Sequence, residues 1–283
     1  MVKIAKDETD LLLKYIYDIS GISLDQTKTY LLETRLGPLL EENGFSSYRE
    51  LYNKAIADAG KTVEKKIIDA ISTNETLFFR DKGPFDVLRH KILPDLIDAR
   101  SARFSGKLPV PVRIWSAGCS TGQEIYSIAI ILKELLPDIS KYNIKLLGTD
   151  ISDTAIARAS KAIYNKFEIE RGLPPEILRK YFSPVNGEWK VKDEIRAMAT
   201  FRKLNLMLPF KDLGKFDIVL CRNVAIYFNI EDRKMLFERI AAVMEPDGYL
   251  IIGSTESLSG ISSKFKPHRH IRSIYYRLVP DKE

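Results

Sequence analysis

The chain contains few of the residues that build disulfide frameworks, metal centres or membrane spans. Only 2 of its 283 residues are cysteine and only 3 are histidine, which argues against a disulfide-stapled fold and a histidine-ligated metal site. No stretch reaches the roughly 18–20 apolar residues of a membrane helix. Charged residues crowd the N-terminus, where a signal peptide would be apolar. We therefore expect a cytoplasmic protein with reduced thiols, no metal and no membrane insertion.

Charge is distributed unevenly along the chain. The formal net charge is +6, but residues 1–80 hold 11 basic and 13 acidic residues, whereas the remainder holds 33 and 25. A basic surplus of this size favours an acidic partner, either nucleic acid or an acidic protein surface; a solvated basic face is the simpler alternative. At 45% hydrophobic and 29% charged, the composition is that of a globular chain with one large or two modest domains.

The first 80 residues have the periodicity of a small helical bundle. Apolar residues recur every three or four positions in four stretches, most of them followed by glycine or a polar turn. The four apolar stripes begin near Leu11, Leu31, Tyr48 and Val63. They predict an all-helical N-terminal domain over residues 1–80, with the stripes facing a common core.

Strands and helices alternate from residue 112 onward, as a parallel α/β sheet requires. We therefore expect a doubly wound, Rossmann-like domain over residues 112–283. Residues 179–203 differ, because aromatic residues lie on both sides of an Asn-Gly turn at 186–187. They predict a small antiparallel β-subdomain inserted into the larger domain.

Residues 81–111 are expected to connect the two domains. A helix is predicted over about 84–102, and the glycine and prolines of 105–111 are typical of a linker. The predicted fold class is therefore α/β, with a separate helical domain ahead of the sheet.

A glycine-bearing turn near the start of the sheet carries the strongest indication of a ligand. A buried-strand pattern ends at Ala117, Gly118 and Gly122 follow, and an apolar helix begins near residue 123; a second apolar strand ends at Asp150. This is the layout of a nucleoside site, in which the acid accepts both ribose hydroxyls and glycine lets the backbone approach the ligand. The structural alternative for Asp150 is a turn or helix-capping acid.

The spacing in this turn distinguishes between nucleoside cofactors. Dinucleotide sites use G-x-G-x-x-G to hold a pyrophosphate, but three residues separate Gly118 from Gly122 and no third glycine follows. Glu124 would repel a phosphate, whereas it would attract the ammonium and sulfonium groups of S-adenosylmethionine; its alternative role is to stabilise the helix N-terminus. Asn223 follows another strand at the ligand-binding edge of the sheet. These residues favour S-adenosylmethionine.

Six groups of motifs occur together along nearly the whole chain. They are T-N-E-T at 73–76 with F-F-R at 78–80, W-S-A-G-C-S-T-G at 115–122, G-T-D-I at 148–151, N-L at 205–206, F-D-I-V-L-C-R-N-V at 216–224 with I-Y-F at 226–228, and G-S-T-E-S-L at 253–258. Any one motif can arise by chance, but their order and joint presence are specific. The chain resembles the CheR family of chemotaxis-receptor glutamate methyltransferases.

The resemblance implies a fold, a reaction and a set of site residues. It implies an all-helical domain followed by an S-adenosylmethionine-dependent methyltransferase domain with an inserted β-subdomain. A methyl group would be transferred to glutamates on the cytoplasmic helical domain of chemoreceptors, leaving S-adenosylhomocysteine. Arg80 and Tyr227 are the expected catalytic residues. The expected cofactor-binding residues, from the resemblance and the glycine turn, are Asn74, Thr76, Arg80, Gly118, Glu124, Asp150, Asn205, Leu206, Asn223 and Val224.

The chain departs from the family at two places. Gln123 and Ile125 flank Glu124 where members commonly have glutamate and proline, but the second acid is retained. The loop at 183–188 is shorter than in members that dock on a C-terminal pentapeptide of the receptor. We therefore expect no pentapeptide tether.

Two other functions are weighed against this one. A nucleic-acid methyltransferase fits the basic surplus, but the Asn/Asp-Pro-Pro-Tyr/Phe turn of amino-methylating enzymes is missing after Arg222, where Asn223 and Val224 follow. A non-catalytic sensor of the cofactor is the second alternative, and the presence of Arg80 and Asp150 argues against it. We therefore expect no nucleic-acid partner.

Overall fold

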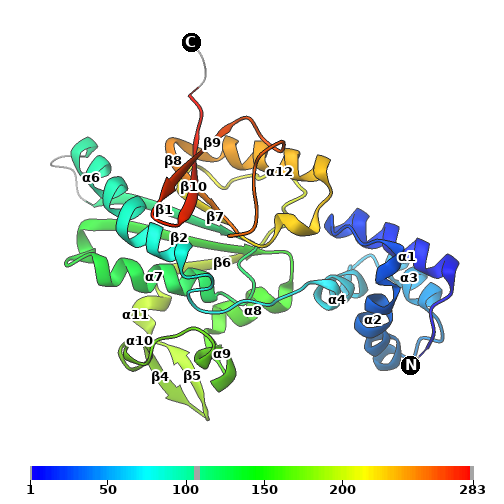
Figure 1. The fold of residues 1–283 in the computed structure, drawn as a ribbon. Coiled ribbons are helices and arrows are strands. Elements are labelled where there is room, and N and C mark those ends of the chain that lie inside the picture. Colours follow the sequence, from blue (N-terminus) through cyan, green and yellow to red (C-terminus); the bar gives the residue numbers. More distant parts are fainter. Residues whose placement is uncertain (1, 105–108, 281–283) are drawn as a thin grey trace.

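The computed structural model describes residues 2–104 and 109–280; part of the expected linker, residues 105–108, lies outside them. Figure 1 shows a group of helices, drawn in blue, beside a larger α/β unit, and the segment 72–82 runs between them. The predicted order, helical domain first and mixed α/β domain second, is confirmed.

Four helices and a short 3-10 turn make the N-terminal unit. They are α1 (Lys6–Ser20), η1 (Gln26–Lys28), α2 (Thr29–Asn43), α3 (Tyr48–Ala57) and α4 (Thr62–Ile71). The apolar stripes predicted from the sequence pack together into one cluster that includes Leu12, Leu36, Leu51 and Ile67, all fully buried. Asp25 caps η1, because its carboxylate accepts a hydrogen bond from the Thr27 amide at 2.8 Å.

The helix predicted at about 84–102 is divided into three parts. They are α5 (Gly83–Val87), a π-helical turn η2 (Leu88–Ile92) and α6 (Leu93–Arg103). Pro94 has no amide hydrogen for the carbonyl four residues earlier, and its ring would collide with that carbonyl. The wider π turn, in which the Leu93 amide donates to the Leu88 carbonyl, accommodates the proline.

The central sheet has seven strands in the order β6-β2-β1-β7-β8-β10-β9. Their bounds are β1 (Val110–Ala117), β2 (Tyr142–Asp150), β6 (Ala199–Lys203), β7 (Phe216–Cys221), β8 (Met244–Ile252), β9 (Phe265–His270) and β10 (Ser273–Leu278). The first five in spatial order pair in parallel, and β10 and β9 close the sheet antiparallel. Because the chain order reverses between β1 and β7, the carboxyl ends of these strands form a crevice for a ligand.

Helices cover both faces of the sheet. Figure 1 shows α6 and α7 (Gln123–Leu135) on one side and α12 (Ile230–Ala242) on the other, with α8 (Asp153–Lys161) beside β6. Each face has its own apolar cluster, one built around Ile114 and Ile128, the other around Trp115 and Phe237. Alternate residues of β1 therefore fill opposite cores, as the pleat of a strand requires.

A second, three-stranded antiparallel sheet lies outside the main sheet and confirms the predicted insertion. It contains β3 (Ile163–Tyr164), β5 (Glu188–Val191) and β4 (Phe182–Val185), in that spatial order. Asn186 and Gly187 both have positive φ, 48° and 80°, which is the two-residue hairpin turn expected from this dipeptide. Three short helices, α9 (Lys166–Glu170), α10 (Pro175–Tyr181) and α11 (Asp193–Arg196), and two 3-10 turns, η3 (Ile139–Lys141) and η4 (Ala225–Tyr227), complete the described elements.

The expected range of the small subdomain, 179–203, requires correction at both ends. Residues 199–203 form β6, which pairs in parallel with β2 at the edge of the main sheet. Residues 163–164 instead belong to the small sheet, because β3 pairs with β5. A two-residue strand is too short to show an alternating pattern, and β6 alternates like a strand of either sheet.

Hydrogen bonds hold the helical unit against the carboxyl edge of the main sheet. Asp69 of α4 accepts from the Ser152 and Thr154 hydroxyls at 2.6 and 2.8 Å, at the start of α8. On the other side of the crevice, the Tyr17 hydroxyl donates to Asp232 of α12 at 2.8 Å. Among the helices that the structure describes, none is long and apolar enough to span a membrane.

Candidate functional site

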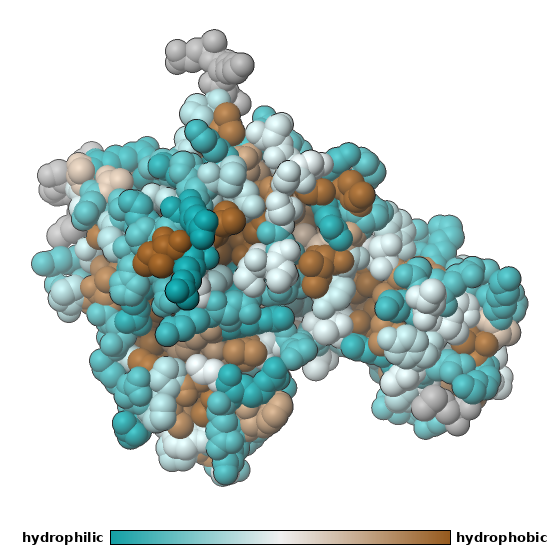
Figure 2. All heavy atoms as spheres, in the orientation of Figure 1, coloured by the Kyte–Doolittle hydropathy of each residue, from teal (hydrophilic) through white to brown (hydrophobic). Residues whose placement is uncertain are grey.

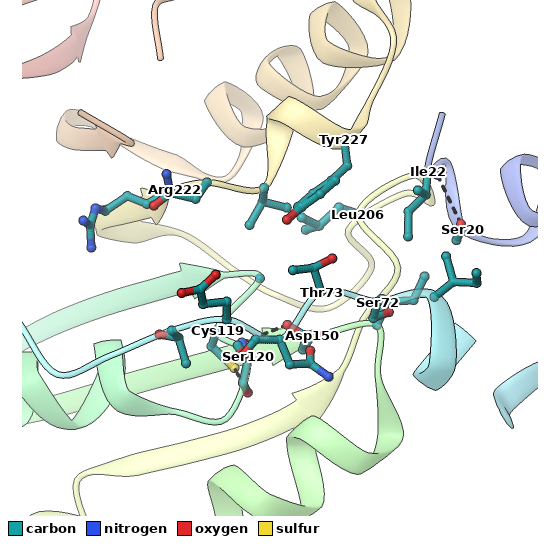
Figure 3. Close-up of a pocket in the computed structure, with 18 of the residues that line it drawn as sticks. Ser20, Ile22, Ser72, Thr73, Cys119, Ser120, Asp150, Leu206, Arg222 and Tyr227 are labelled. Atoms are coloured by element: carbon teal, nitrogen blue, oxygen red, sulfur yellow. Dashed lines mark hydrogen bonds between the residues drawn. The ribbon is translucent and has the colours of Figure 1, made fainter. Parts of the chain in front are cut away.

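One pocket lies between the helical unit and the carboxyl edge of the sheet, with about 1100 Å³ of empty space including its open mouth. All eleven site residues expected from the sequence line it: Asn74, Thr76, Arg80, Gly118, Glu124, Asp150, Asn205, Leu206, Asn223, Val224 and Tyr227. Figure 3 shows Tyr227 and Leu206 on one wall and Cys119, Ser120 and Asp150 on the opposite wall. Residues from 74 to 227 therefore meet at one site.

The glycine turn after β1 packs more closely against protein than the sequence predicts. Gly118 and Gly122 have positive φ, 79° and 93°, which glycine adopts without strain. A Cβ on Gly118 would collide with Val224, and one on Gly122 would lie 2.9 Å from the Cβ of Ala159 in α8. Both glycines are therefore required by packing between protein segments, and Gly122 does not line the pocket. The expectation that a Cβ on Gly122 would meet the ligand is therefore corrected, whereas the close approach of Gly118 to the ligand stays a prediction.

Asp150 ends β2 and faces the pocket with a partly satisfied carboxylate. One oxygen accepts from the Ser120 amide at 2.8 Å and the other from the Ser152 amide at 3.0 Å. A carboxylate oxygen has two lone-pair sites, so each oxygen retains capacity for a hydroxyl donor. Burial raises the pKa of Asp150 above its ordinary value, and the backbone hydrogen bonds oppose that shift. The two amides also fix the direction of the carboxylate.

Glu124 and Arg222 form a buried ion pair beside the glycine turn. Arg222 Nη1 lies 2.7 Å from Glu124 Oε2, and the Ser116 hydroxyl donates to Glu124 Oε1 at 2.7 Å. The Arg222 side chain is 2% exposed and the Glu124 side chain is 13% exposed. Glu124 is therefore already paired with a protein cation, which the sequence argument for Glu124 omits. The sequence does not single out Arg222 as a site residue, although its position directly after β7, at the ligand-binding edge of the sheet, could have indicated one.

Arg222 also holds the segment that carries Arg80. Its Nη2 donates to the Arg80 carbonyl at 2.8 Å and lies 3.0 Å from Asp81 Oδ2, and its guanidinium stacks over Phe85. Phe79, Asp81 and Lys82 all have positive φ, an uncommon conformation for residues with side chains. Three such residues in four need support from the surrounding structure. Arg222 supplies part of it from β7.

Asn223 is held in a left-handed conformation, with φ of 56°, by the G-S-T-E-S-L motif. The Glu256 carboxylate accepts from the Asn223 amide at 2.8 Å and from the Gly253 amide at 2.6 Å. A Cβ on Gly253 would collide with this carboxylate. The motif therefore positions Asn223, but residues 253–258 do not themselves line the pocket.

The helical unit forms the apolar side of the pocket. Ile22, Leu24 and Leu31 line it, and the Ser23 amide donates to the Tyr227 carbonyl at 2.8 Å. Asn205 donates its side-chain amide to the Ile19 carbonyl at 3.0 Å, so this residue joins the two units as well as lining the site. Of Ile22, Leu24 and Leu31, the sequence predicts only Leu31, as part of an apolar stripe that faces the helical core, and it does not single out the other two.

The segment 73–77 crosses the pocket between the two units. Asn74, Thr76 and their neighbours line the cavity, and the Asn74 carbonyl accepts from the Ser120 hydroxyl at 3.0 Å. Arg80 Nη1 donates to the Glu75 carbonyl at 2.9 Å, which folds the arginine back over this segment. Neither Asn74 nor Thr76 caps a helix, because no helix begins between the end of α4 at Ile71 and the start of α5 at Gly83. The structural alternative of capping is therefore wrong for both.

Breaking the Arg222 pairs is expected to destabilise the fold. The Arg222→Met variant leaves Glu124 and Asp81 without their cation, and such a loss lowers the free energy of unfolding by about 3 kcal/mol. Urea denaturation followed by circular dichroism measures this. Arg202→Met, which removes an exposed arginine, is the matched control. Equal urea midpoints for the two variants would contradict the structural role of Arg222.

The donor set fits a nucleoside that carries a positively charged amino-acid tail. Asp150 offers acceptors for ribose hydroxyls, and the leucine and isoleucine side chains offer an apolar surface for a base. Burial raises the pKa of the Cys119 and Cys221 thiols well above the ordinary value, so neither is an activated nucleophile. Among the described residues, no three His, Cys, Asp or Glu side chains group as metal ligands.

Comparisons with known proteins agree with this geometry. The model of the CheR methyltransferase all-alpha domain matches residues 7–72, and that of the CheR methyltransferase S-adenosylmethionine-binding domain matches residues 74–273. Chemotaxis protein methyltransferase Cher2 of Pseudomonas putida is 38% identical over 87% of this chain and 88% of its own length.

Two further relatives match more of the chain. Chemotaxis protein methyltransferase 1 of Pseudomonas aeruginosa is 36% identical over 96% of this chain and 98% of its own length. Its namesake in Vibrio cholerae is 37% identical over 94% of each chain. The two domain models together cover most of the described residues. The chain belongs to the CheR methyltransferase family, and its larger domain is the S-adenosylmethionine-binding domain of that family.

Proposed function

We propose that this chain transfers a methyl group from S-adenosylmethionine to glutamate side chains on the cytoplasmic helical domain of chemoreceptors, forming methyl esters. The observation that carries the proposal is the single pocket in which Arg80, Asp150, Asn223 and Tyr227 meet, in a chain of the CheR family. The substrate class comes from the names of the relatives, which are chemotaxis protein methyltransferases. The reaction would take place in the cytoplasm, where those receptor helices lie.

Cofactor binding is proposed for the residues around the glycine turn and the strand ends. Asp150 would accept the ribose hydroxyls, and Leu206 with the helical-unit residues would contact the base. Asn74, Thr76, Asn223 and Val224 would contact the remainder of the molecule. When bound, S-adenosylmethionine supplies an electrophilic methyl group on its sulfonium. Glu124 would place negative charge near that cation, partly offset by Arg222.

The chain's own contribution to the reaction is alignment and exclusion of water. A glutamate side chain is ionised at pH 7, so no general base is needed. Arg80 would hold the substrate carboxylate by charge-assisted hydrogen bonds, and the Tyr227 hydroxyl would donate to its second oxygen. Figure 3 shows Tyr227 pointing into the cavity. Holding the nucleophile in line in a largely apolar cleft lowers the barrier through proximity and desolvation.

The division of the chain follows the same proposal. Residues 1–80 form the helical domain that closes one side of the pocket, and residues 112–283 form the methyltransferase domain. Residues 81–111 connect these two domains. Asp69, paired with the start of α8, and Asn205, paired with α1, keep the helical domain over the site.

Radiolabelled S-adenosylmethionine, incubated with the chain and with membranes from the source cells, tests the proposed reaction. Label should appear on the receptor band and be released as methanol by mild base, because only carboxyl methyl esters are base-labile in this way. DNA and RNA serve as comparison substrates, and we expect no label on either. Label on nucleic acid would favour the first alternative function. Cofactor binding without transfer to any substrate would favour the sensor.

A pentapeptide tether is not expected for this chain. Val185 pairs with Glu188 across a turn of only two residues, so the β4–β5 hairpin has no extended loop. The expected result is no measurable binding of a receptor C-terminal pentapeptide at up to about 100 μM, measured by calorimetry. Binding at micromolar affinity would overturn this part of the proposal.

A further inference from the structure

The β9–β10 hairpin carries positive charge that no nearby acid balances. Residues 257–280 include five lysines and arginines and no aspartate or glutamate: Lys264, Lys266, Arg269, Arg272 and Arg277. Among the described residues, none of the five forms an ion pair. Residues 257–280 therefore hold a local surplus of five positive charges with no acidic residue among them.

Two of these charges directly face each other across the hairpin. Lys266 of β9 is the register partner of Arg277 in β10. Like charges at such positions destabilise a strand pair by a few tenths of a kcal/mol to about 1 kcal/mol. Burial against Tyr275 lowers the pKa of the neighbouring His268, and the charges of Arg277 and Lys266 lower it further. The arrangement is unfavourable for the isolated chain, which points to an anionic partner.

The tip of the hairpin borders the segment that presents Arg80. β10 begins at Ser273, and a Cβ on Gly83 would lie 2.5 Å from the Ser273 hydroxyl oxygen. At the tip, Ile271 and Ile274 are 72% and 53% exposed. Figure 2 shows strongly hydrophilic side chains, bordered by brown hydrophobic ones, over the region where Figure 1 draws this hairpin. Cationic and apolar groups therefore occur together beside the site.

Helix α2 of the helical domain offers no comparable surface. Helix α2 carries Glu33, Glu41 and Glu42 and has Arg35 as its single cation. The Arg35 guanidinium donates to the Ala70 and Ser72 carbonyls at 3.3 and 2.9 Å, so it lies against the C-terminal end of α4. An acidic partner would be repelled from this helix and attracted to the hairpin.

We propose that the β9–β10 hairpin is the surface on which the acidic substrate helix of the receptor docks before its glutamate enters the pocket. The proposal rests on the proposed function for the identity of the partner. Receptor carboxylates would contact Arg269 and Arg272, and apolar side chains of the same helix would cover the exposed isoleucines. Methylation removes one negative charge per glutamate, so the hairpin holds the product less strongly than the substrate.

The test reverses two charges at the tip. Arg269→Glu with Arg272→Glu is compared with Lys141→Glu plus Lys145→Glu, which makes the same charge change near the amino end of β2, on the other half of the sheet. Arg269→Gln with Arg272→Gln is the milder version if the first variant folds poorly. The substrate is a purified cytoplasmic receptor fragment. KM for the fragment, kcat and the Kd for S-adenosylmethionine are measured at low salt and at about 0.15 M salt.

The hairpin reversal should raise KM for the receptor about tenfold or more and flatten its salt dependence, with kcat and cofactor Kd unchanged. The control should change KM less than threefold. A fragment with glutamine at its methylation sites should bind the wild type more weakly, and the hairpin variant should lose this preference. Equal KM values for hairpin and control variants would overturn the dock. The dock would also be overturned if the hairpin reversal abolished binding to phosphatidylserine vesicles but left the KM for the receptor fragment unchanged.

Failure of the dock and failure of the proposed function give different results. If the wild-type chain methylates no receptor fragment at all, the proposed function is wrong. If the wild type methylates the fragment and the hairpin variant does so with the same KM, only the docking surface is wrong.

Discussion

Replacing Asp150 with alanine is expected to weaken S-adenosylmethionine binding by about 100-fold or more. Two hydrogen bonds from ribose hydroxyls to a charged acceptor contribute about 1.5–3 kcal/mol each, and every 1.4 kcal/mol is a factor of ten in Kd. The alanine also leaves the Ser120 and Ser152 amides without their acceptor, which loosens the glycine turn. Calorimetric titration with S-adenosylhomocysteine measures the loss without interference from turnover.

Asp153→Asn provides the matched control, because Asp153 lies three residues further on and its carboxylate pairs with exposed Lys203. This variant should bind the cofactor within about twofold of wild type. A wild-type-like Kd for Asp150→Ala would show that the ribose is held elsewhere.

The pH dependence gives a second measurement of the same residue. The ionised carboxylate is the acceptor, so affinity should be complete above the pKa of Asp150 and fall as the pH drops through it. Because burial raises that pKa, the loss begins at a higher pH than for an exposed aspartate. The Asp150→Asn variant, which cannot ionise, should show a lower affinity without this pH dependence. A pH-dependent loss of the same size in Asp150→Asn would assign the titration to another group.

Replacing Arg80 with alanine is expected to lower kcat for receptor methylation by about 100-fold or more, the size of effect that follows from losing a positioning, charge-assisted contact to the nucleophile. Lysine at this position should restore only part of the rate, since it lacks the planar fork that binds a carboxylate through two nitrogens. The hydrogen bond from the Arg222 guanidinium to the carbonyl of residue 80 does not involve the Arg80 side chain, so both variants should keep the fold.

Separate measurements of kcat, receptor KM and cofactor Kd distinguish the two roles proposed for Arg80. A fall in kcat with cofactor Kd unchanged assigns it to the substrate carboxylate. A parallel loss of cofactor affinity assigns it to the cofactor. Arg89→Ala, which changes an arginine outside the pocket lining, is the control. Full turnover by Arg80→Ala would remove this residue from the proposed mechanism.

The arrangement of local elements follows closely from the pattern of residues. The apolar stripes of 1–80 predict the helices that form the first core, because a helix buries the residues that share its face. The Asn186-Gly187 turn and the capping of η1 by Asp25 also follow from residue types with a local conformational preference. By contrast, the exchange of 163–164 for 199–203 between the two sheets depends on strand partners that are distant in the chain.

The site shows the same division between local pattern and long-range contact. The glycine turn, Asp150 and Asn223 could be predicted, because residues at the ends of parallel strands necessarily meet at one edge of a sheet. The pairing of Arg222 with Glu124 and with the Arg80 segment could not, since it joins residues up to 142 positions apart. The same holds for the clamp of Glu256 on Asn223 and for the helical-domain side chains in the pocket wall.

Residue order alone therefore established the class of fold, the family and the positions at which a cofactor site would form, because periodicity, turn chemistry and motif spacing are properties of neighbouring residues. Only the tertiary structure decided which charges are paired, which glycines are required by packing, and that the basic hairpin lies against Gly83, three residues after Arg80. These outcomes depend on distances between segments far apart in the chain, and such distances are set when the helical domain and the two sheets pack together.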